Sequence, residues 1–156
     1  MKTAVISWLL LFGVCSGTYG QLTTLFPTAT AGYKPVGKPD CTSMNMAGVP
    51  PMNTCSQTYT NGKLTITVSI TEYPKGNPAM VDYGALGNKQ GDDPSAGAYT
   101  YEKLAVGRAT GSVTFMKQSK MATASLTVGN TLLLDVSGAN QPGGEAVKAL
   151  AKALKL

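Results

Sequence analysis

The side chains that most often carry enzyme chemistry are scarce in this sequence. Its 156 residues include no histidine, and aspartate and glutamate together number eight. Without histidine the chain has no imidazole base near neutral pH, no Ser-His or Cys-His nucleophile pair and no imidazole ligand for zinc. Catalysis would then require two carboxylates to converge with different pKa values. We therefore expect a protein that is not an enzyme and that carries no cofactor.

The charged residues indicate neither a hard-metal site nor a nucleic-acid surface. Asp92 and Asp93 are adjacent and could offer oxygen ligands to calcium. The Asp-x-Asp-x-Asp-Gly spacing of a calcium loop is absent, so a solvated turn is favoured. The net charge is +5, but the lysines are dispersed and form no dense basic run interleaved with aromatic residues. We expect no resident metal and no nucleic-acid partner.

Two cysteines are expected to form a disulfide. Cys15 lies in an apolar leader, which leaves Cys41 and Cys55 as an even pair in an exported chain. Oxidising compartments join such pairs, and closing a loop of about 15 residues contributes about 3 kcal/mol in the chain-entropy model. Two free redox thiols are the alternative, but the Cys-x-x-Cys spacing is absent.

Three methionines, Met44, Met46 and Met52, lie in the segment between these cysteines. Thioethers are soft ligands that suit a metal such as copper. Methionine is also a common filler of gaps in protein cores. The sequence leaves both interpretations open.

A ladder of hydroxyl side chains accompanies the clearest strand pattern. From Lys63 to Thr71 apolar residues alternate with Thr65, Thr67, Ser69 and Thr71. A regular hydroxyl array could bind an ordered surface such as ice, mineral or polysaccharide. Threonine is also an ordinary choice for a solvated strand face. Four further threonines could continue the array across a sheet: Thr110, Thr114, Thr123 and Thr127.

The C-terminal segment is predicted to be a basic amphipathic helix over residues 143–156. Lys148, Lys152 and Lys155 recur at helical spacing beside an apolar stripe, which is the pattern of a helix on an anionic membrane or partner surface. A docking helix with a solvated basic face is the alternative. We favour docking, because an isolated helix this short is marginal in water and must pack on something.

The first twenty residues predict an export signal. Lys2 precedes an apolar run from Ala4 to Val14, and small residues around Gly20 favour cleavage after it. An uncleaved anchor is the alternative, but the run is shorter than the ~20 residues that span a bilayer. Beyond the leader no apolar run approaches membrane length, so we expect no transmembrane segment in the mature chain.

The remaining residues predict one small α+β domain covering residues 21–156. Residues 21–60, rich in proline, threonine and glycine, are expected to be irregular and stapled by the disulfide, and residues 61–156 to hold the sheet and helix. We expect an antiparallel sheet of four to five strands with the C-terminal helix packed on one face. Between the strands we expect a short helix over residues 77–86 and a polar loop over residues 88–97.

The expected function is binding outside the cell. The leading hypothesis is a secreted, non-enzymatic binding or structural protein of an extracellular matrix or coat, or a periplasmic one in a bacterium. Its partner is an unidentified extracellular macromolecule or surface. Membrane-surface binding through the basic helix is one alternative. A carrier that holds an apolar ligand between sheet and helix is another, and its cavity would be lined by Leu64, Ile66, Val68, Leu150 and Leu154.

Overall fold

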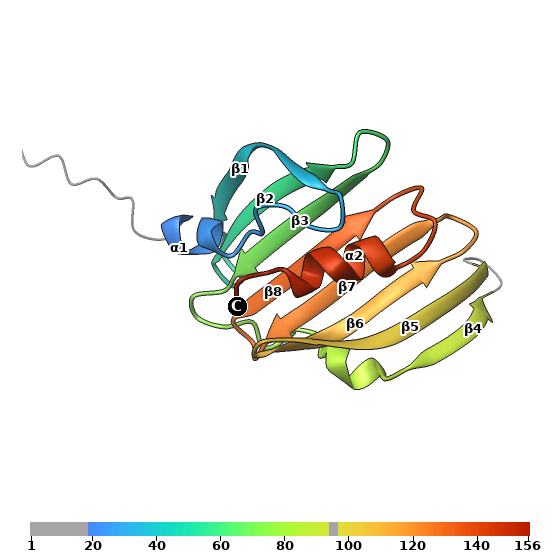
Figure 1. The fold of residues 1–156 in the computed structure, drawn as a ribbon. Helices are drawn as coiled ribbons and strands as arrows, with labels where there is room; N and C mark the ends of the chain where they lie inside the picture. The colour runs from blue at the N-terminus through green and yellow to red at the C-terminus, as the bar shows by residue number, and fades with distance from the viewer. Residues whose placement is uncertain (1–18, 94–96) are drawn as a thin grey trace, which may run out of the picture.

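The structure, a computed structural model, describes residues 19–93 and 97–156. Its main feature is one antiparallel sheet of eight strands in the spatial order β1-β2-β3-β8-β7-β6-β5-β4 (Figure 1). Two short α-helices and a 3-10 turn accompany the sheet in the described residues. The elements are α1 (Tyr19–Thr24), β1 (Lys34–Met44), β2 (Met52–Thr60), β3 (Thr65–Glu72), η1 (Tyr83–Leu86), β4 (Lys89–Asp93), β5 (Gly97–Val106), β6 (Ala109–Met116), β7 (Met121–Val128), β8 (Leu132–Gly138) and α2 (Glu145–Lys152).

The sheet consists of two meanders joined side by side. Strands β1 to β3 form one meander and strands β4 to β8 form the other, and β3 pairs with β8 to unite them. Residues 73–88, which we call the crossover, connect the meanders across one face of the sheet and contain η1. Backbone bonds tie its start to the turn between β7 and β8, where Tyr73 N–H donates to Thr131 O (2.8 Å) and Asn77 N–H to Asn130 O (2.7 Å).

The hydrophobic core lies between one face of the sheet and α2. The alternation in β3 and β8 directs Ile66, Val68, Ile70, Leu134 and Val136 to this face, where all five are fully buried. Helix α2 lies across β8 and β7 (Figure 1) and buries Val147, Leu150 and Ala151 against them. The residues expected to line an apolar cavity between sheet and helix instead pack in this core, except Leu64, which is only partly buried.

The N-terminal segment covers the same face at the β2 side. Leu22 of α1 and Phe26 are buried, and the Tyr59 hydroxyl donates to Pro27 O at 2.7 Å. Burial raises the pKa of Tyr59 to about 12, which keeps this phenol neutral and able to donate. The hydroxyl of Tyr33 donates to Gln141 Oε1 (3.2 Å), which links this segment to the loop before α2.

The expected fold class was wrong, because the sheet has eight strands and not four to five. Residues 21–60, expected to be irregular, contain β1 and β2. Strand β1 tolerates Pro35 and Pro39 because it is the edge of the sheet, where a missing N–H costs no ladder bond, and its register shifts between Val36 and Asp40. Strand β2 escaped detection because half of its buried face is polar: Asn53, Cys55, Gln57 and Tyr59.

Two further expectations in the middle of the chain were also wrong. The segment expected as a polar loop, residues 88–97, contains β4, which pairs with β5 from Lys89 opposite Tyr101 to Asp93 opposite Gly97. The short helix expected over residues 77–86 is reduced to the 3-10 turn η1. The C-terminal helix is present but ends at Lys152.

The predicted disulfide is confirmed. Cys41 and Cys55 are directly opposite each other in β1 and β2, with their Cα atoms 4.1 Å apart. The bridge fastens the proline-containing edge strand to the interior of the sheet, and Cys55 is fully buried.

The predicted leader lies almost wholly outside the described residues, and the expected cleavage point after Gly20 falls within α1. Among the helices of the described residues, none combines the length and the apolar character needed to cross a bilayer.

Replacement of Leu150 by alanine tests the packing of α2. This fully buried side chain would leave a cavity between helix and sheet, so Leu150→Ala should lower the free energy of unfolding by about 2–5 kcal/mol. The exposed Lys152, on the same helix, provides the matched control, and Lys152→Ala should change stability by less than about 0.5 kcal/mol. Urea unfolding followed by circular dichroism measures both. Equal effects would show that α2 is not docked through its apolar stripe.

Candidate functional site

The face of the sheet opposite α2 carries mostly hydroxyl side chains, and we call it the hydroxyl face. The same alternation that buries apolar residues under α2 places serine and threonine on this other face in β2, β3, β6 and β7. Strand pairing aligns these side chains in rows that run across the strands. The face is therefore polar over most of its width.

One row crosses five neighbouring strands with a hydroxyl on each. Thr58 pairs with Thr67, and Ser137 of β8 lies opposite Thr67 on one side and Thr123 of β7 on the other. All five side chains are at least partly exposed. We call these residues the hydroxyl row: Thr58, Thr67, Ser137, Thr123 and Thr114.

The hydroxyls in the neighbouring rows differ from those of the hydroxyl row in their hydrogen bonding, because several of them bond to one another. Thr54 Oγ1 and Thr71 Oγ1 are 3.0 Å apart, and Ser56 Oγ and Ser69 Oγ are 2.8 Å apart. Within the described residues no hydrogen bond engages the side-chain hydroxyl of any member of the hydroxyl row; Thr58 is bonded only through its backbone carbonyl, which accepts from Gln57 Nε2 at 3.2 Å. The hydroxyls of the row are thus not used for bonds within the described residues, whereas the hydroxyls of Thr54, Thr71, Ser56 and Ser69 bond to one another inside the sheet.

One carboxylate lies in the row next to the hydroxyl row. Ser125 Oγ–H donates to Asp135 Oδ1 at 2.6 Å. Burial raises the pKa of Asp135, and the Ser125 hydrogen bond opposes this rise by favouring the charged form. Tyr83 of the crossover is near Asp135. Burial raises the pKa of Tyr83, and the negative charge of Asp135 raises it further. Tyr83 therefore stays a neutral phenol beside this part of the face.

The crossover covers the β6 side of the hydroxyl face. Asp82 Oδ1 accepts from Gly84 N–H (2.9 Å) at the start of η1, which shapes the turn. A Cβ on Gly84 would lie 3.1 Å from Thr110 Oγ1, so η1 approaches the sheet more closely than a side chain would comfortably allow. At its far end, the side chain of Asn88 accepts from Lys103 N–H at 2.7 Å. The turn η1 thus packs closely on β6, and the Asn88 side chain ties the chain after η1 to β5.

The hydroxyl row leads into a small pocket under this crossover. The pocket has a volume of about 190 Å³ and contains the last two members of the row, Thr123 and Thr114. Tyr101, which pairs with Thr114, continues the row, and Tyr83 belongs to the crossover. The lining bears no formal charge and consists of Tyr83, Leu86, Tyr101, Ser112, Thr114, Met116, Met121, Thr123 and Ser125.

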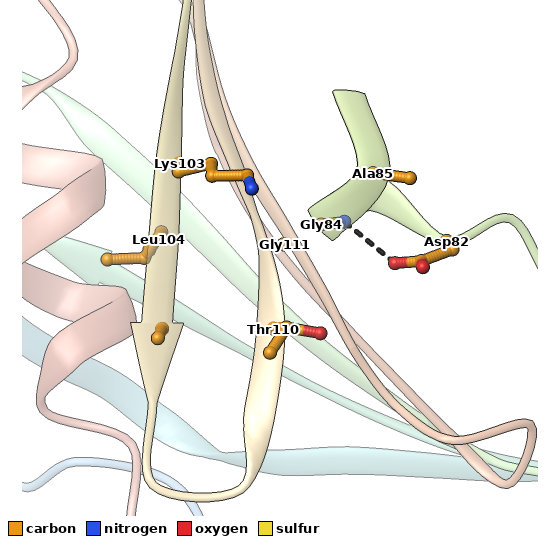
Figure 2. A pocket seen from close by; sticks show the side chains of 8 residues that line it. Asp82, Gly84, Ala85, Lys103, Leu104, Thr110 and Gly111 are labelled. Atoms are coloured by element: carbon orange, nitrogen blue, oxygen red, sulfur yellow. Dashed lines mark hydrogen bonds between the residues drawn. The ribbon is translucent and has the colours of Figure 1, made fainter. Parts of the chain in front are cut away.

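A larger pocket of about 480 Å³ lies on the other side of η1. Figure 2 shows Lys103 and Thr110 directed toward η1, whereas Leu104 points to the opposite side of the sheet. Asp82 supplies a carboxylate at the crossover wall, and no ion pair joins it to Lys103 in the described residues. This pocket presents charges of both signs, in contrast to the uncharged pocket at the end of the hydroxyl row.

The structure places the predicted ladder residues on the hydroxyl face. Thr65, Thr67, Ser69 and Thr71 share it in β3, as expected from their alternation. The threonines predicted to continue the array have the same orientation, but Thr127 is buried and Thr110 lines both the larger pocket and another one near Gly129. Thr114 and Thr123 remain at the surface, in line with Thr67.

The three lysines predicted as a membrane or partner face are not equivalent. Lys148 Nζ pairs with Glu102 Oε1 at 2.5 Å, which leaves its side chain 19% exposed. This hydrogen bond raises the pKa of Lys148. Lys152 and Lys155 are exposed, while the apolar stripe beside them is buried on the sheet. The arrangement corresponds to a docked helix with a solvated basic side.

The residues that were weighed as metal ligands, but not predicted to be so, lie at the edges of the sheet. Asp92 is exposed on the edge strand β4, and the side chain of Asp93 lies outside the described residues. In the described residues no three His, Cys, Asp or Glu side chains gather as a metal site. Met44 and Met52 end opposite each other at the tip of the β1–β2 hairpin.

Sequence reasoning missed half of this site. The hydroxyls of β2 belong to the face, but their strand was not recognised because Asn53 and Gln57 interrupt the apolar pattern. Tyr83 and Tyr101 were not singled out, since only the crossover path brings them together. A strict alternation of Thr54, Ser56, Thr58 and Thr60 was the signal that could have revealed this strand.

Comparisons with protein-family models, with curated proteins and with solved structures found no match for this chain.

Ionisation of Asp135 should lower the stability of the fold. Because its folded-state pKa is raised above the ordinary 3.8, the folded chain binds this proton more tightly than the unfolded chain does. The stabilisation is present below the ordinary pKa and is lost as pH rises through the folded pKa. As the pH rises from acidic to neutral, the Tm of wild type should therefore fall relative to the Tm of Asp135→Asn. Thermal unfolding of both proteins measures this difference.

The exposed Asp40, which lies on β1, provides the control for charge removal. If the Tm difference between wild type and Asp135→Asn is the same at pH 3 and pH 7, burial does not raise the pKa of the Asp135 carboxyl group. The same pH-dependent gain in Asp40→Asn would also contradict the assignment, because it would reflect net charge alone.

Proposed function

We propose that this chain is a secreted, non-enzymatic protein that binds a neutral polysaccharide through the hydroxyl row. The observation that carries the proposal is the alignment of five unbonded hydroxyls on five adjacent strands, leading to the pocket of Tyr83 and Tyr101. The support is chemical, since each hydroxyl both donates and accepts, as does each hydroxyl of a sugar.

The spacing of the row and its lack of charged side chains support a sugar polymer as the partner. Adjacent strands lie about 4.7–4.9 Å apart, which is comparable with the length of one hexose unit along an extended chain. The row itself carries no charged side chain. At its end, the aromatic rings of Tyr83 and Tyr101 offer apolar faces for the C–H side of a sugar and hydroxyl tips for its polar edge.

The twist of the sheet makes a flexible polymer chain a better partner for the hydroxyl row than the flat surface of a crystal. Adjacent strands rotate by about 20–25° relative to each other, so a row crossing five strands does not lie in one plane. An ice or mineral lattice needs a flat array of matching points, whereas a polysaccharide can follow the twist. We therefore prefer the polysaccharide among the ordered surfaces that a hydroxyl array could bind.

Secretion is part of the proposal and rests on two features. The leader pattern of residues 1–20 predicts export. The Cys41–Cys55 disulfide is typical of oxidising compartments outside the cytosol. An apolar carrier is not proposed, because Ile66, Val68 and Leu150 fill the space between sheet and helix.

Removal of two hydroxyls from the row tests this function. Thr67→Val and Thr123→Val keep the branched shape and the strand preference of threonine and remove only the hydroxyl. Each lost bond is worth about 0.5–1.5 kcal/mol, so each variant should bind roughly two- to tenfold more weakly. Depletion assays on swollen, amorphous chitin, cellulose and β-1,3-glucan, whose chains are not held in a crystal, measure the affinity.

Thr42→Val is the matched control, because Thr42 is an exposed threonine of β1 outside the row. It should bind as wild type does. Binding to none of the three polysaccharides, or binding by Thr67→Val and Thr123→Val that equals that of wild type, would refute the proposal. Adsorption to calcium carbonate or thermal hysteresis that is lost in the variants would assign the row to a crystal surface instead.

A further inference from the structure

The tip of the β1–β2 hairpin collects three methionines. Met44 and Met52 are the last residue pair of the two strands and lie directly opposite each other. Side chains in such a pair have Cβ atoms about 4.5–5.5 Å apart and share one face. Met46 follows Met44 by two residues, just where the chain leaves the strand. All three thioethers therefore start from one end of one hairpin.

These methionines do not act as core filler. Met44 is 43% exposed and Met46 is 58% exposed, and Met52 is partly exposed. Flexible apolar side chains at a solvent-exposed tip give little packing energy, so burial does not account for them.

The hairpin holds the three residues in a defined frame. Val49 N–H donates to Met46 O at 3.2 Å, which closes a turn directly after Met46. The Cys41–Cys55 disulfide crosses the hairpin three residues before Met44 and three after Met52. Ser43 Oγ–H donates to Asn53 Oδ1 at 2.7 Å in the intervening pair. A covalent bridge and a side-chain bond thus limit the freedom of both strands below the tip.

We propose that Met44, Met46 and Met52 form a binding site for a monovalent soft metal ion, Cu(I). Thioether sulfur is a soft neutral ligand and favours Cu(I) over the hard ions that prefer carboxylates. The three side chains are long and flexible, so they can turn toward one ion from the positions that the hairpin provides. The site is separate from the hydroxyl row and does not depend on polysaccharide binding.

The pH dependence of binding distinguishes thioethers from other ligands. Cysteine, histidine and carboxylate ligands must lose a proton to bind a metal, so their affinity falls in acid. A thioether has no proton to lose. Affinity for Cu(I) should therefore be unchanged between pH 7 and pH 5.

The experiment is a Cu(I) titration of the full chain against a chromophoric Cu(I) chelator. Ascorbate keeps the copper reduced, and a Cys15→Ser background removes the thiol that is not in the disulfide. One Cu(I) per chain is expected. Met44→Leu, Met46→Leu and Met52→Leu preserve volume and should each weaken binding at least tenfold.

The chain offers a matched control in a second methionine pair. Met116 and Met121 also face each other across two strands, at the β6–β7 hairpin, and the loop that joins them, residues 117–120, contains no methionine. Met116→Leu with Met121→Leu should leave Cu(I) affinity unchanged. Circular dichroism confirms that all variants fold.

Three results would overturn the proposal. The first is the absence of Cu(I) binding in the wild-type chain. The second is unchanged affinity in all three hairpin variants, which would leave the exposed tip as a contact surface for another protein. The third is a steep loss of affinity at pH 5, which would place the metal on protonatable ligands elsewhere.

Discussion

The pairing of β3 with β8 is the contact on which the rest of the structure depends. It joins two meanders from distant parts of the chain into one sheet and aligns Ile70 with Leu134 and Val68 with Val136. The buried face formed by these residues gives α2 its docking surface. Helix α2 packs on β8, β7 and β5 of one meander, whereas α1 packs on β2 of the other. Without the β3–β8 pairing these two parts of the buried face would be separate, and no row of side chains would cross both meanders.

The same pairing gives the two faces different roles. On the α2 face, buried aliphatic side chains supply the stability of the fold. On the other face, small hydroxyl side chains line the surface, and among residues 19–93 and 97–156 the crossover covers part of it. Residues that would bind a partner are therefore separated from those that hold the chain together, so hydroxyls of the row can be replaced without loss of the core.

Much of the local structure was predictable, and the long-range structure was not. The alternation in β3 and the Cys41–Cys55 pair were visible in the sequence, because each depends on neighbouring residues or on a single pairing rule. Strand β2 was hidden by its buried Asn53 and Gln57, whose polar groups are bonded within the fold. The sequence predicted that Thr67, Thr123 and Thr114 belong to an array that crosses the sheet, but it did not place Thr58 and Ser137 in that row. Their alignment requires the pairing of β3 with β2 and β8, which the alternation within a single strand does not specify.

The central claim is that the partner binds across β3, β8 and β7 on the hydroxyl face. Amide chemical-shift mapping of the isotope-labelled chain with a soluble neutral oligosaccharide, chitohexaose, tests it most directly. The chemical shifts are expected to change along the row through Thr67, Ser137 and Thr123 to Tyr101, while those of α2 stay unchanged. Shifts centred on α2, or scattered over both faces, would contradict it.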